Sequence, residues 1–163
     1  MDRANEKKPL GWLASGEPVY DRPCSHIHGS VKKLLPEIFA GISRPGRFLE
    51  KEHSFGRTVG TRSCVPTGAG DQIVYAQRPG RKGLTRFVKG REEAPSDTAV
   101  VVLKKDERKA HYILITAFIG RKSALEPWDE RATDKDRDFW SCHALVYGSE
   151  KTVPGTETTE CPW

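Results

Sequence analysis

The sequence predicts an α+β fold in which an N-terminal helix packs on a mostly antiparallel sheet of about five strands. Three observations lead to it: an apolar helical face between residues 30 and 42, five later β-like runs, and a hydrophilic turn joining two of those runs. A chain of 163 residues, 36% of them hydrophobic, is long enough for one sizeable core. We therefore expect a single domain over residues 26–149, an N-terminal arm over 1–25 and a flexible tail over 150–163.

The helix is predicted from a spacing of apolar residues that repeats every three and four positions. Ser30 is the expected N-cap. Pro36 lacks the N–H that would bond back to Lys32, so the helix is kinked there or begins near Leu35. The residues of its apolar face are Val31, Leu34, Leu35, Ile38, Phe39 and Ile42.

The strands are predicted from runs rich in β-branched and aromatic residues, bounded by Gly, Pro or charges. Residues 98–104 are apolar on both faces, which favours an interior strand, and the polar turn after them favours antiparallel pairing with the next strand. Residues 121–138 have no apolar period and are expected to form a surface loop with a short helical turn before Phe139 and Trp140. The five runs are 72–77, 84–88, 98–104, 111–119 and 143–147.

Positive charge is concentrated in the middle of the chain. The net charge is +5, and residues 44–91 contain 11 Lys/Arg against 3 Asp/Glu. Arginine supplies most of this charge, and guanidinium binds phosphate through paired hydrogen bonds. The segment favours a polyanionic partner over a surface that is basic for solubility alone.

The stretch "AQRPGRKGLTRFV", residues 76–88, combines a turn with a basic strand. Pro79 and Gly80 suit a tight turn, from which Arg78, Arg81 and Lys82 would project as exposed charges that attract phosphate. On the following strand, a period of two places Arg86 among apolar neighbours. Arg86 is therefore expected to have a defined anionic partner, either an internal carboxylate or a ligand phosphate.

Further polar residues lie on or beside the predicted strands. His53 stands near Arg57 and could carry a proton, or it could be an ordinary surface histidine. Thr116 is placed in one apolar row with Tyr112, Leu114 and Phe118, where its hydroxyl would contact phosphate or satisfy a backbone carbonyl. The indole of Trp128 is expected to cover a surface; contact with a base is the less favoured alternative. His143, at the start of the last predicted strand, is a further candidate for the site.

A metal site is a disfavoured alternative. Cys24, His26 and His28 would lie on one side of an extended segment, but a fourth ligand such as Cys64 would have to come from far away. No phosphate-binding P-loop, nucleophile elbow or H-E-x-x-H pattern occurs, which argues against a nucleoside triphosphatase or a serine hydrolase. Without a C-x-x-C spacing, an apolar leader or a long apolar run, we expect reduced thiols, a cytoplasmic location and no membrane association.

The runs "EHSFGRTVG", "YAQRPGRKGLTRFVK", "HYILITAFIG" and "FWSCHALVY" resemble the barnase, EndoU, colicin and RelE group of metal-independent ribonucleases, whose shared architecture is called the BECR fold. The likeness covers about residues 48–148 and is closest to toxins of phages or mobile elements. It implies cleavage of RNA through a 2′,3′-cyclic phosphate with no cofactor. It also implies RNA as partner, together with an immunity or antitoxin protein.

On this resemblance, His53 is expected to act as base or acid and His143 as its complement. Arg78 and Arg86 are expected to form a phosphate clamp, and Thr116 to donate a hydrogen bond to the phosphate. The expected substrate-binding residues are Arg57, Tyr75, Arg81, Lys82, Arg91 and Trp128. The rival hypothesis is a binding module without catalysis, which uses the same basic segment but makes no demand on the histidines. A group transferase, such as an ADP-ribosyltransferase built from Arg, a strand hydroxyl and Glu126, is a third alternative.

Overall fold

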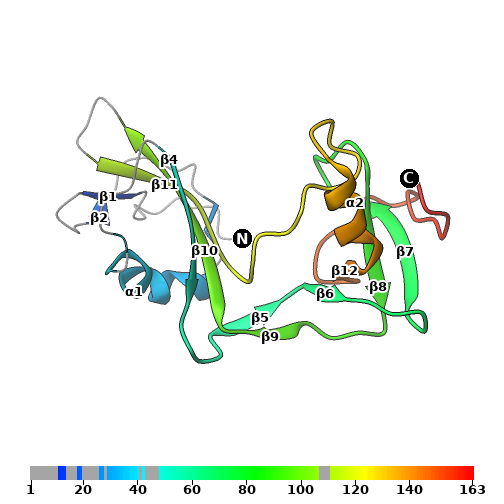
Figure 1. Cartoon of the computed structure of the whole chain (residues 1–163), viewed down its shortest axis with the longest axis horizontal. Coiled ribbons are helices and arrows are strands. Elements are labelled where there is room, and N and C mark those ends of the chain that lie inside the picture. The colour runs from blue at the N-terminus through cyan, green and yellow to red at the C-terminus, as the bar shows by residue number, and fades with distance from the viewer. Residues whose placement is uncertain are drawn as a thin grey trace. The chain divides into compact units, whose positions relative to one another are not determined.

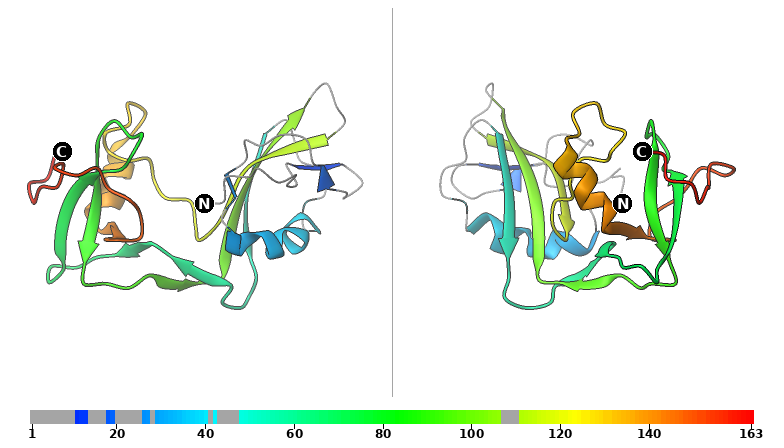
Figure 2. Two further views of the ribbon diagram at one scale, coloured as in Figure 1. Left: turned by 180° about the vertical axis from the view of Figure 1, so that it is seen from behind. Right: turned by 45° about the vertical axis from the view of Figure 1, so that its right-hand side comes forward.

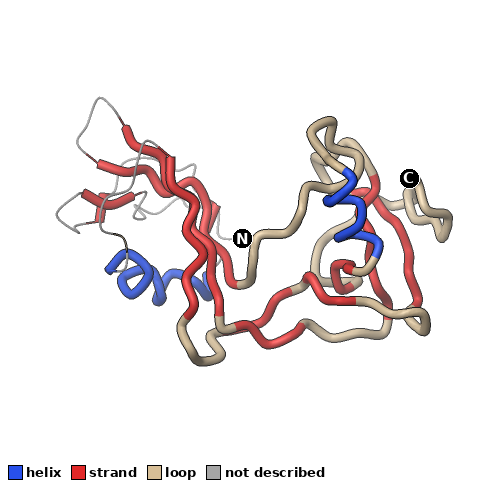
Figure 3. The backbone as a smooth tube through the Cα atoms, in the orientation of Figure 1, coloured by secondary structure: helices blue, strands red, loops and turns tan. Residues whose placement is uncertain are grey.

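The computed structural model describes residues 11–13, 18–19, 26–27, 29–40, 42, 48–106 and 111–163. The chain forms two compact units: unit 1 comprises Met1–Gly60 and Ser96–Arg121, and unit 2 comprises Thr61–Pro95 and Lys122–Trp163. Strand and loop predominate in both, and helix is confined to short stretches (Figure 3). The mixed α+β class is confirmed, but the five predicted strands belong to two separate sheets, so the prediction of one sheet of about five strands is wrong.

Unit 1 is built on a sheet whose strands follow the order β2-β1-β11-β10-β4, with β3 parallel to β11 (Figure 1). β10 lies between β11 and β4 and pairs antiparallel with both, as the apolar run and the polar turn predicted. The strand bounds are β1 Gly11–Leu13, β2 Pro18–Val19, β3 His26–Ile27, β4 Phe48–Ser54, β10 Thr98–Asp106 and β11 His111–Ile119.

One face of this sheet is covered by a 3₁₀ helix, η1 (Gly29–Leu34), and the α-helix that continues it, α1 (Leu35–Ala40). The α-helix begins at Leu35, and Pro36 in its first turn needs no N–H partner. Ser30 lies inside η1, so its prediction as N-cap is wrong. The predicted apolar face packs on the sheet in a core made of Val31, Leu34, Leu35, Ile38, Ala99, Val101, Leu103, Leu114 and Ala117.

Unit 2 is built on a second sheet of order β6-β12-β8-β7, which carries an apolar cluster on each face. β12 is parallel to β8, whereas the other pairs are antiparallel. α2 (Asp134–Ser141) contributes Trp140 to one cluster and leads directly into β12, its neighbour in both views of Figure 2. The strand bounds are β6 Cys64–Pro66, β7 Gln72–Gln77, β8 Leu84–Lys89 and β12 His143–Val146.

The segment that follows β12 runs along the free edge of β7. Thr158 and Tyr75 exchange two backbone hydrogen bonds of 2.8 Å, and the Val153 N–H donates to the Gln77 carbonyl at 2.7 Å. The prediction of a flexible tail did not anticipate these bonds, which protect the edge strand from pairing with another chain.

A two-stranded sheet of β5 (Gly60–Arg62) and β9 (Ala94–Ser96) contains two of the points at which the chain passes from one unit to the other. None of the helices in the described ranges is both long and apolar enough to span a membrane.

Candidate functional site

The predicted catalytic residues are divided between the two units. His53 and Thr116 belong to unit 1, and Arg78, Arg86 and His143 belong to unit 2. The geometry of each group is therefore described within its own unit.

In unit 1, His53 lies on β4, half-buried, with its ring edge-on to Phe55 at 4.7 Å. Arg57 donates to both carboxylate oxygens of Glu37, at 3.1 and 2.8 Å, and its guanidinium lies 5.4 Å from the centre of the Phe55 ring. The hydrogen bond from Arg57 lowers the pKa of Glu37 and the same bond raises the pKa of Arg57. Arg57, the predicted substrate contact, thus has an internal partner at the surface.

Thr116 does not share a face with Leu114, contrary to the prediction. The pairing of β10 with β11 shifts between Val102 and Leu103, which leaves Ile115 as an extra residue in β11. Such a bulge reverses the alternation of side chains after it. Leu114 and Ala117 therefore both face the helix-covered core, and Thr116 points to the opposite face.

In unit 2, the predicted turn forms as expected. The Arg81 N–H donates to the Arg78 carbonyl at 3.1 Å, and Gly80 has φ of +75°, which suits a type II turn with Pro79 before it. Arg81 and Lys82 are exposed, as predicted, and neither forms an ion pair with a residue of the described ranges.

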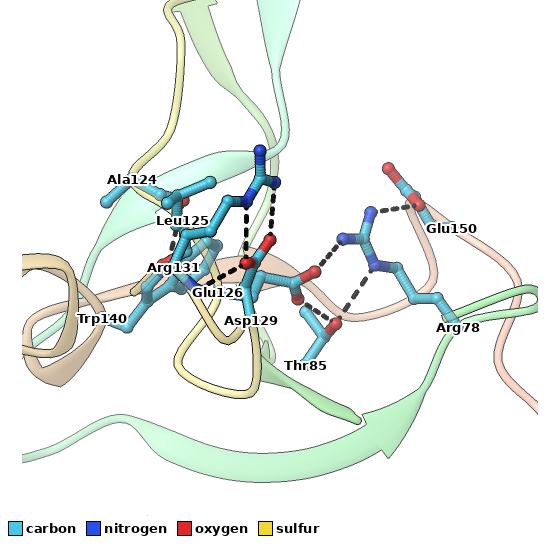
Figure 4. Close-up of polar contacts among 9 residues, drawn as sticks. All are labelled: Arg78, Thr85, Ala124, Leu125, Glu126, Asp129, Arg131, Trp140 and Glu150. Atoms are coloured by element: carbon cyan, nitrogen blue, oxygen red, sulfur yellow. Dashed lines mark hydrogen bonds and ion pairs between the residues drawn. The ribbon is translucent and has the colours of Figure 1, made fainter. Parts of the chain in front are cut away.

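Arg78, by contrast, is turned inward, so its prediction as an exposed charge is wrong. Its guanidinium donates to Glu126 at 2.7 Å, to Glu150 at 3.0 Å and to the Thr85 hydroxyl at 3.1 Å (Figure 4). The Thr85 hydroxyl donates to the second oxygen of Glu126. The side chains of Arg78 and Glu126 are only 15% and 11% exposed. Burial opposes the charge of Arg78, but the two carboxylates outweigh it and raise the pKa of the guanidinium.

The loop that carries Glu126 is fixed at several points. The indole N–H of Trp140 on α2 donates to the carbonyls of Ala124 and Leu125, at 3.2 and 3.1 Å (Figure 4). Trp128 packs against Gly83, where an added Cβ would overlap the indole. Its Nε1 is buried without a hydrogen-bond partner among the described residues. Trp128 thus covers the hairpin, which was the favoured of its two predicted roles.

Arg86 has a different environment on the opposite face of the same hairpin. Its Nη1 donates to the Thr67 hydroxyl at 2.9 Å and to the backbone carbonyl of His143 at 2.8 Å. No carboxylate of the described chain forms an ion pair with it. Asp71 is held instead by the Gly68 N–H and by Arg91, which together lower its pKa with only a smaller effect from Arg86.

Of the two partners predicted for Arg86, the internal carboxylate is not found among the described residues, where neutral oxygens orient the guanidinium; the ligand phosphate stays a prediction. The same contacts give Arg91, a predicted substrate contact, an internal carboxylate partner in Asp71.

His143 is held in one orientation and one tautomer. Its ring stacks on Phe139 with the ring centres 4.0 Å apart and the planes 2° from parallel. Nδ1 lies 2.9 Å from the Phe139 carbonyl, which can only accept, so Nδ1 carries the proton and Nε2 the lone pair. Nδ1 also contacts the Cys142 Sγ at 3.3 Å. Nε2 makes no hydrogen bond within the described parts of the chain.

A pocket of about 370 Å³ lies beside Arg86. Tyr75 and Arg86 come from neighbouring strands, Arg137 and Trp140 from α2, and Trp163 from the segment that runs along β7. Burial raises the pKa of Tyr75, and a hydrogen bond with Cys161 acts in the same direction. The pocket thus combines two guanidinium groups with aromatic rings.

Metal ligation by the "CSHIH" stretch is not tested by the described side chains. Cys24 and His28 lie outside the described residues, and of His26 only the backbone is described. Among the described side chains, no group of three or more His, Cys, Asp and Glu is arranged to hold a metal ion.

Several important residues were missed by the sequence analysis. Thr67, Glu150, Cys161 and Trp163 contribute to the site, but each lies in a loop or tail without a periodic pattern. Glu126 was noted only as part of the transferase alternative. One signal was available in the sequence. Tryptophan is rare, and a large apolar ring such as that of Trp163 at the end of a polar segment usually contacts another part of the protein.

No protein-family model matches this sequence, and comparison with curated proteins and with solved structures also found no match.

Proposed function

We propose that the protein is an endoribonuclease that cleaves RNA through a 2′,3′-cyclic phosphate without a metal, and that unit 2 supplies a phosphate-binding residue, Arg86, and a proton carrier, His143. The observation that carries this proposal is that Arg86 forms no ion pair with a carboxylate of the described residues. A half-buried guanidinium that is oriented by neutral oxygens and forms no ion pair with a described carboxylate attracts an anion.

The contacts of Arg86 also support a link between phosphate binding and proton transfer. Arg86 donates to the backbone carbonyl of His143, so the cation and the backbone of the proton carrier are joined by one hydrogen bond of 2.8 Å. In the reaction, a cation stabilises the charge that develops on the phosphoryl oxygens, and this interaction strengthens in the transition state.

His143 suits the role of general base. The proton of the 2′-hydroxyl passes to Nε2 while O2′ bonds to phosphorus and the bond from phosphorus to O5′ breaks. The Phe139 carbonyl stabilises the resulting imidazolium through Nδ1–H. The leaving 5′-oxygen takes a proton from a general acid. The resemblance gives His53 the part of base or acid; His53 belongs to unit 1, and its part in cleavage stays a prediction that the variant His53→Ala tests.

The exposed cations of the turn fit the same function. Arg81 and Lys82 are exposed and form no ion pair with the described residues, so they are available to attract a polyanion. The contacts of Arg78 with Glu126 and Glu150 favour a structural role for that residue, and it is left out of the proposed clamp.

The second candidate function is RNA binding without cleavage, which Arg81, Lys82 and Arg86 would support equally well. The variant His143→Asn separates the two functions. Its side-chain amide can still donate to Phe139 but cannot carry a proton, so we expect RNA cleavage in EDTA to fall about 10²- to 10⁴-fold. Affinity for a substrate with a 2′-deoxy group at the cleavage position should remain within about threefold, because no binding contact is lost.

The products and a second variant complete the test. The wild-type protein should release fragments ending in a 2′,3′-cyclic phosphate, and His53→Ala should also lose cleavage but not binding. Wild-type protein that binds RNA but never cuts it, or His143→Asn that cuts at the normal rate, would refute the enzymatic proposal. In the first case the binding module would stand.

A further inference from the structure

We propose that the pocket beside Arg86 binds one unpaired nucleotide, with its phosphate at Arg86 and its base stacked on Trp163. This inference rests on the proposed function in taking RNA as the ligand. It adds a base-binding subsite and a preference for single-stranded substrate.

The phosphate end of the pocket is defined by two arginines. Arg86 has no carboxylate partner in the described chain. Arg137 pairs with Asp134 three residues earlier on α2, but the two side chains are 44% and 97% exposed. An exposed pair of this kind contributes little stability, so Arg137 can turn to a phosphate at small cost.

The base end is defined by Trp163. Its ring meets Tyr75 edge-to-face, with the ring centres 5.2 Å apart and the planes at 89°. A contact of this geometry covers at most one face of the indole, and Trp163 remains 37% exposed. A partly exposed aromatic ring beside cationic side chains is the usual arrangement for stacking a base of single-stranded nucleic acid.

Trp163 is held at the pocket by its own segment of the chain. Thr158 exchanges backbone hydrogen bonds with Tyr75, and the Gln77 N–H donates to the Thr156 hydroxyl at 3.0 Å. The Cys161 thiol donates to the carbonyl of Trp163 at 3.2 Å. The stacking ring is thus positioned before a ligand binds, which reduces the entropic cost of binding.

The remaining groups suit the edge of a base. Asp138 and Ser141 of α2 also line the pocket, and the carboxylate of Asp138 and the hydroxyl oxygen of Ser141, which donates its proton to the Asp138 carbonyl, can accept from base N–H groups. A volume of about 370 Å³ falls at the small end of the range for ligand pockets. It suits one nucleotide, and a base stacked between its neighbours in a duplex has no free face to stack on Trp163.

The test uses the full chain and measures calorimetrically the binding of inorganic phosphate and of the four nucleoside 3′-monophosphates. At least one nucleotide should bind more tightly than phosphate by about 5- to 150-fold, the range expected for stacking one base. Trp163→Ala should remove this advantage, and Trp163→Phe should keep most of it. Phe48→Ala is the matched control, because Phe48 is an exposed aromatic residue of unit 1, 60% accessible.

The outcomes separate this inference from the proposed function. If no nucleotide binds more tightly than phosphate, or if Trp163→Ala leaves nucleotide binding unchanged, the base subsite is refuted even where RNA is cleaved. If nucleotides bind and Trp163→Ala alone weakens them, the subsite stands even where RNA is never cleaved. In an active protein, a duplex RNA cleaved as fast as a single strand would also overturn the inference.

Discussion

The two arginines of the β7–β8 hairpin lie in opposite electrostatic environments. Arg78 contacts Thr85, which faces the side covered by Trp140, and pairs with two carboxylates. Arg86 is paired across the strands with Tyr75, on the other face, and contacts only neutral oxygens. The residue type and the hairpin are the same, so the partners alone distinguish the two positions.

This difference indicates which charge serves the fold and which serves a ligand. Removing a charge from water is costly unless an opposite charge and hydrogen bonds replace the water. Arg78 satisfies that condition within the chain, and its carboxylates leave little attraction for an external phosphate. Arg86 has hydrogen bonds but no ion pair within the described chain, and an anionic ligand would supply the missing opposite charge.

The largest expected loss of stability follows removal of the charge of Arg78, which is paired with two carboxylates. Arg78→Met keeps much of the aliphatic stem but leaves the carboxylate of Glu126, 11% exposed, without its cation. We expect a loss of about 3 kcal/mol in the free energy of unfolding measured with urea, the low end of the range for breaking a buried ion pair. Arg81→Met, at an exposed position of the same turn, should change it by less than about 0.5 kcal/mol. Equal losses in the two variants would contradict the structural role of Arg78.

The next largest expected effect is a loss of RNA cleavage on removal of the charge of Arg86, which has no ion-pair partner among the described residues. Arg86→Met should lower RNA cleavage about 100-fold, because one cation is lost from the transition state, and should destabilise the fold by only about 1 kcal/mol. The salt dependence of RNA binding isolates its phosphate contact. The slope of log K against log salt should decrease by about 0.7 in Arg86→Met and stay unchanged in folded Arg78→Met. If the slopes changed in the reverse order, the two assignments would have to be exchanged.

The sequence predicted the strands of this hairpin well but not the fate of its arginines. Residues 72–77 and 84–88 match β7 and β8 closely because β-branched residues, Pro79 and Gly80 act locally. The partners of Arg78 come from 48 and 72 residues away in the sequence. Local periodicity carries no information on such long-range contacts, so its inward orientation could not be predicted.

The same limit explains the errors in unit 1. The apolar face of η1 and α1 was predicted from spacing alone, and Pro36 marked the start of the α-helix. The bulge at Ile115 depends on the pairing of β11 with β10, and a single strand pattern cannot show it. The face of Thr116 was consequently misassigned.

A smaller effect tests whether the loop around Trp128 maintains the Arg78 cluster. Gly83→Ala would force the indole away from the hairpin, because the new Cβ overlaps it. We expect a loss of about 1–3 kcal/mol in unfolding free energy, typical of overpacking. Gly68→Ala is the control, since a Cβ there meets no atom and its φ is not positive. RNA binding through Arg86 should persist in both variants; its loss in Gly83→Ala would show that the two faces are coupled.

A smaller loss of stability is expected when the N-terminal cap of α2, the helix that precedes His143, is removed. Thr133 and Asp136 form a capping box, in which the Asp136 carboxylate accepts from the Thr133 N–H at 2.7 Å and from its hydroxyl at 2.9 Å. Thr133→Ala should cost about 1 kcal/mol, measured by urea denaturation. Thr133→Ser keeps the hydroxyl and should retain most of the wild-type stability. An unchanged stability in the alanine variant would mean that tertiary contacts alone hold the helix.

The smallest expected effect is a dependence of stability on acid pH from the loop that carries Glu126. A hydrogen bond from Arg131 lowers the pKa of Asp129 from 3.8 to about 2 in the folded protein. A carboxyl group whose pKa is lower in the folded state stabilises the fold above its unfolded pKa and loses that contribution as the pH falls through the folded value. Thermal melts should therefore show Asp129→Asn less stable than wild type at pH 5, with the difference vanishing as the pH approaches about 2. Arg131, the cation of this pair, is 77% exposed although Asp129 is only 19% exposed, so the difference at pH 5 should also shrink in high salt. The loss caused by Arg78→Met should persist there, because both side chains of its pair with Glu126 are largely buried. A large, salt-resistant effect at Asp129 would show that the loop is held by this pair rather than by the Arg78 cluster.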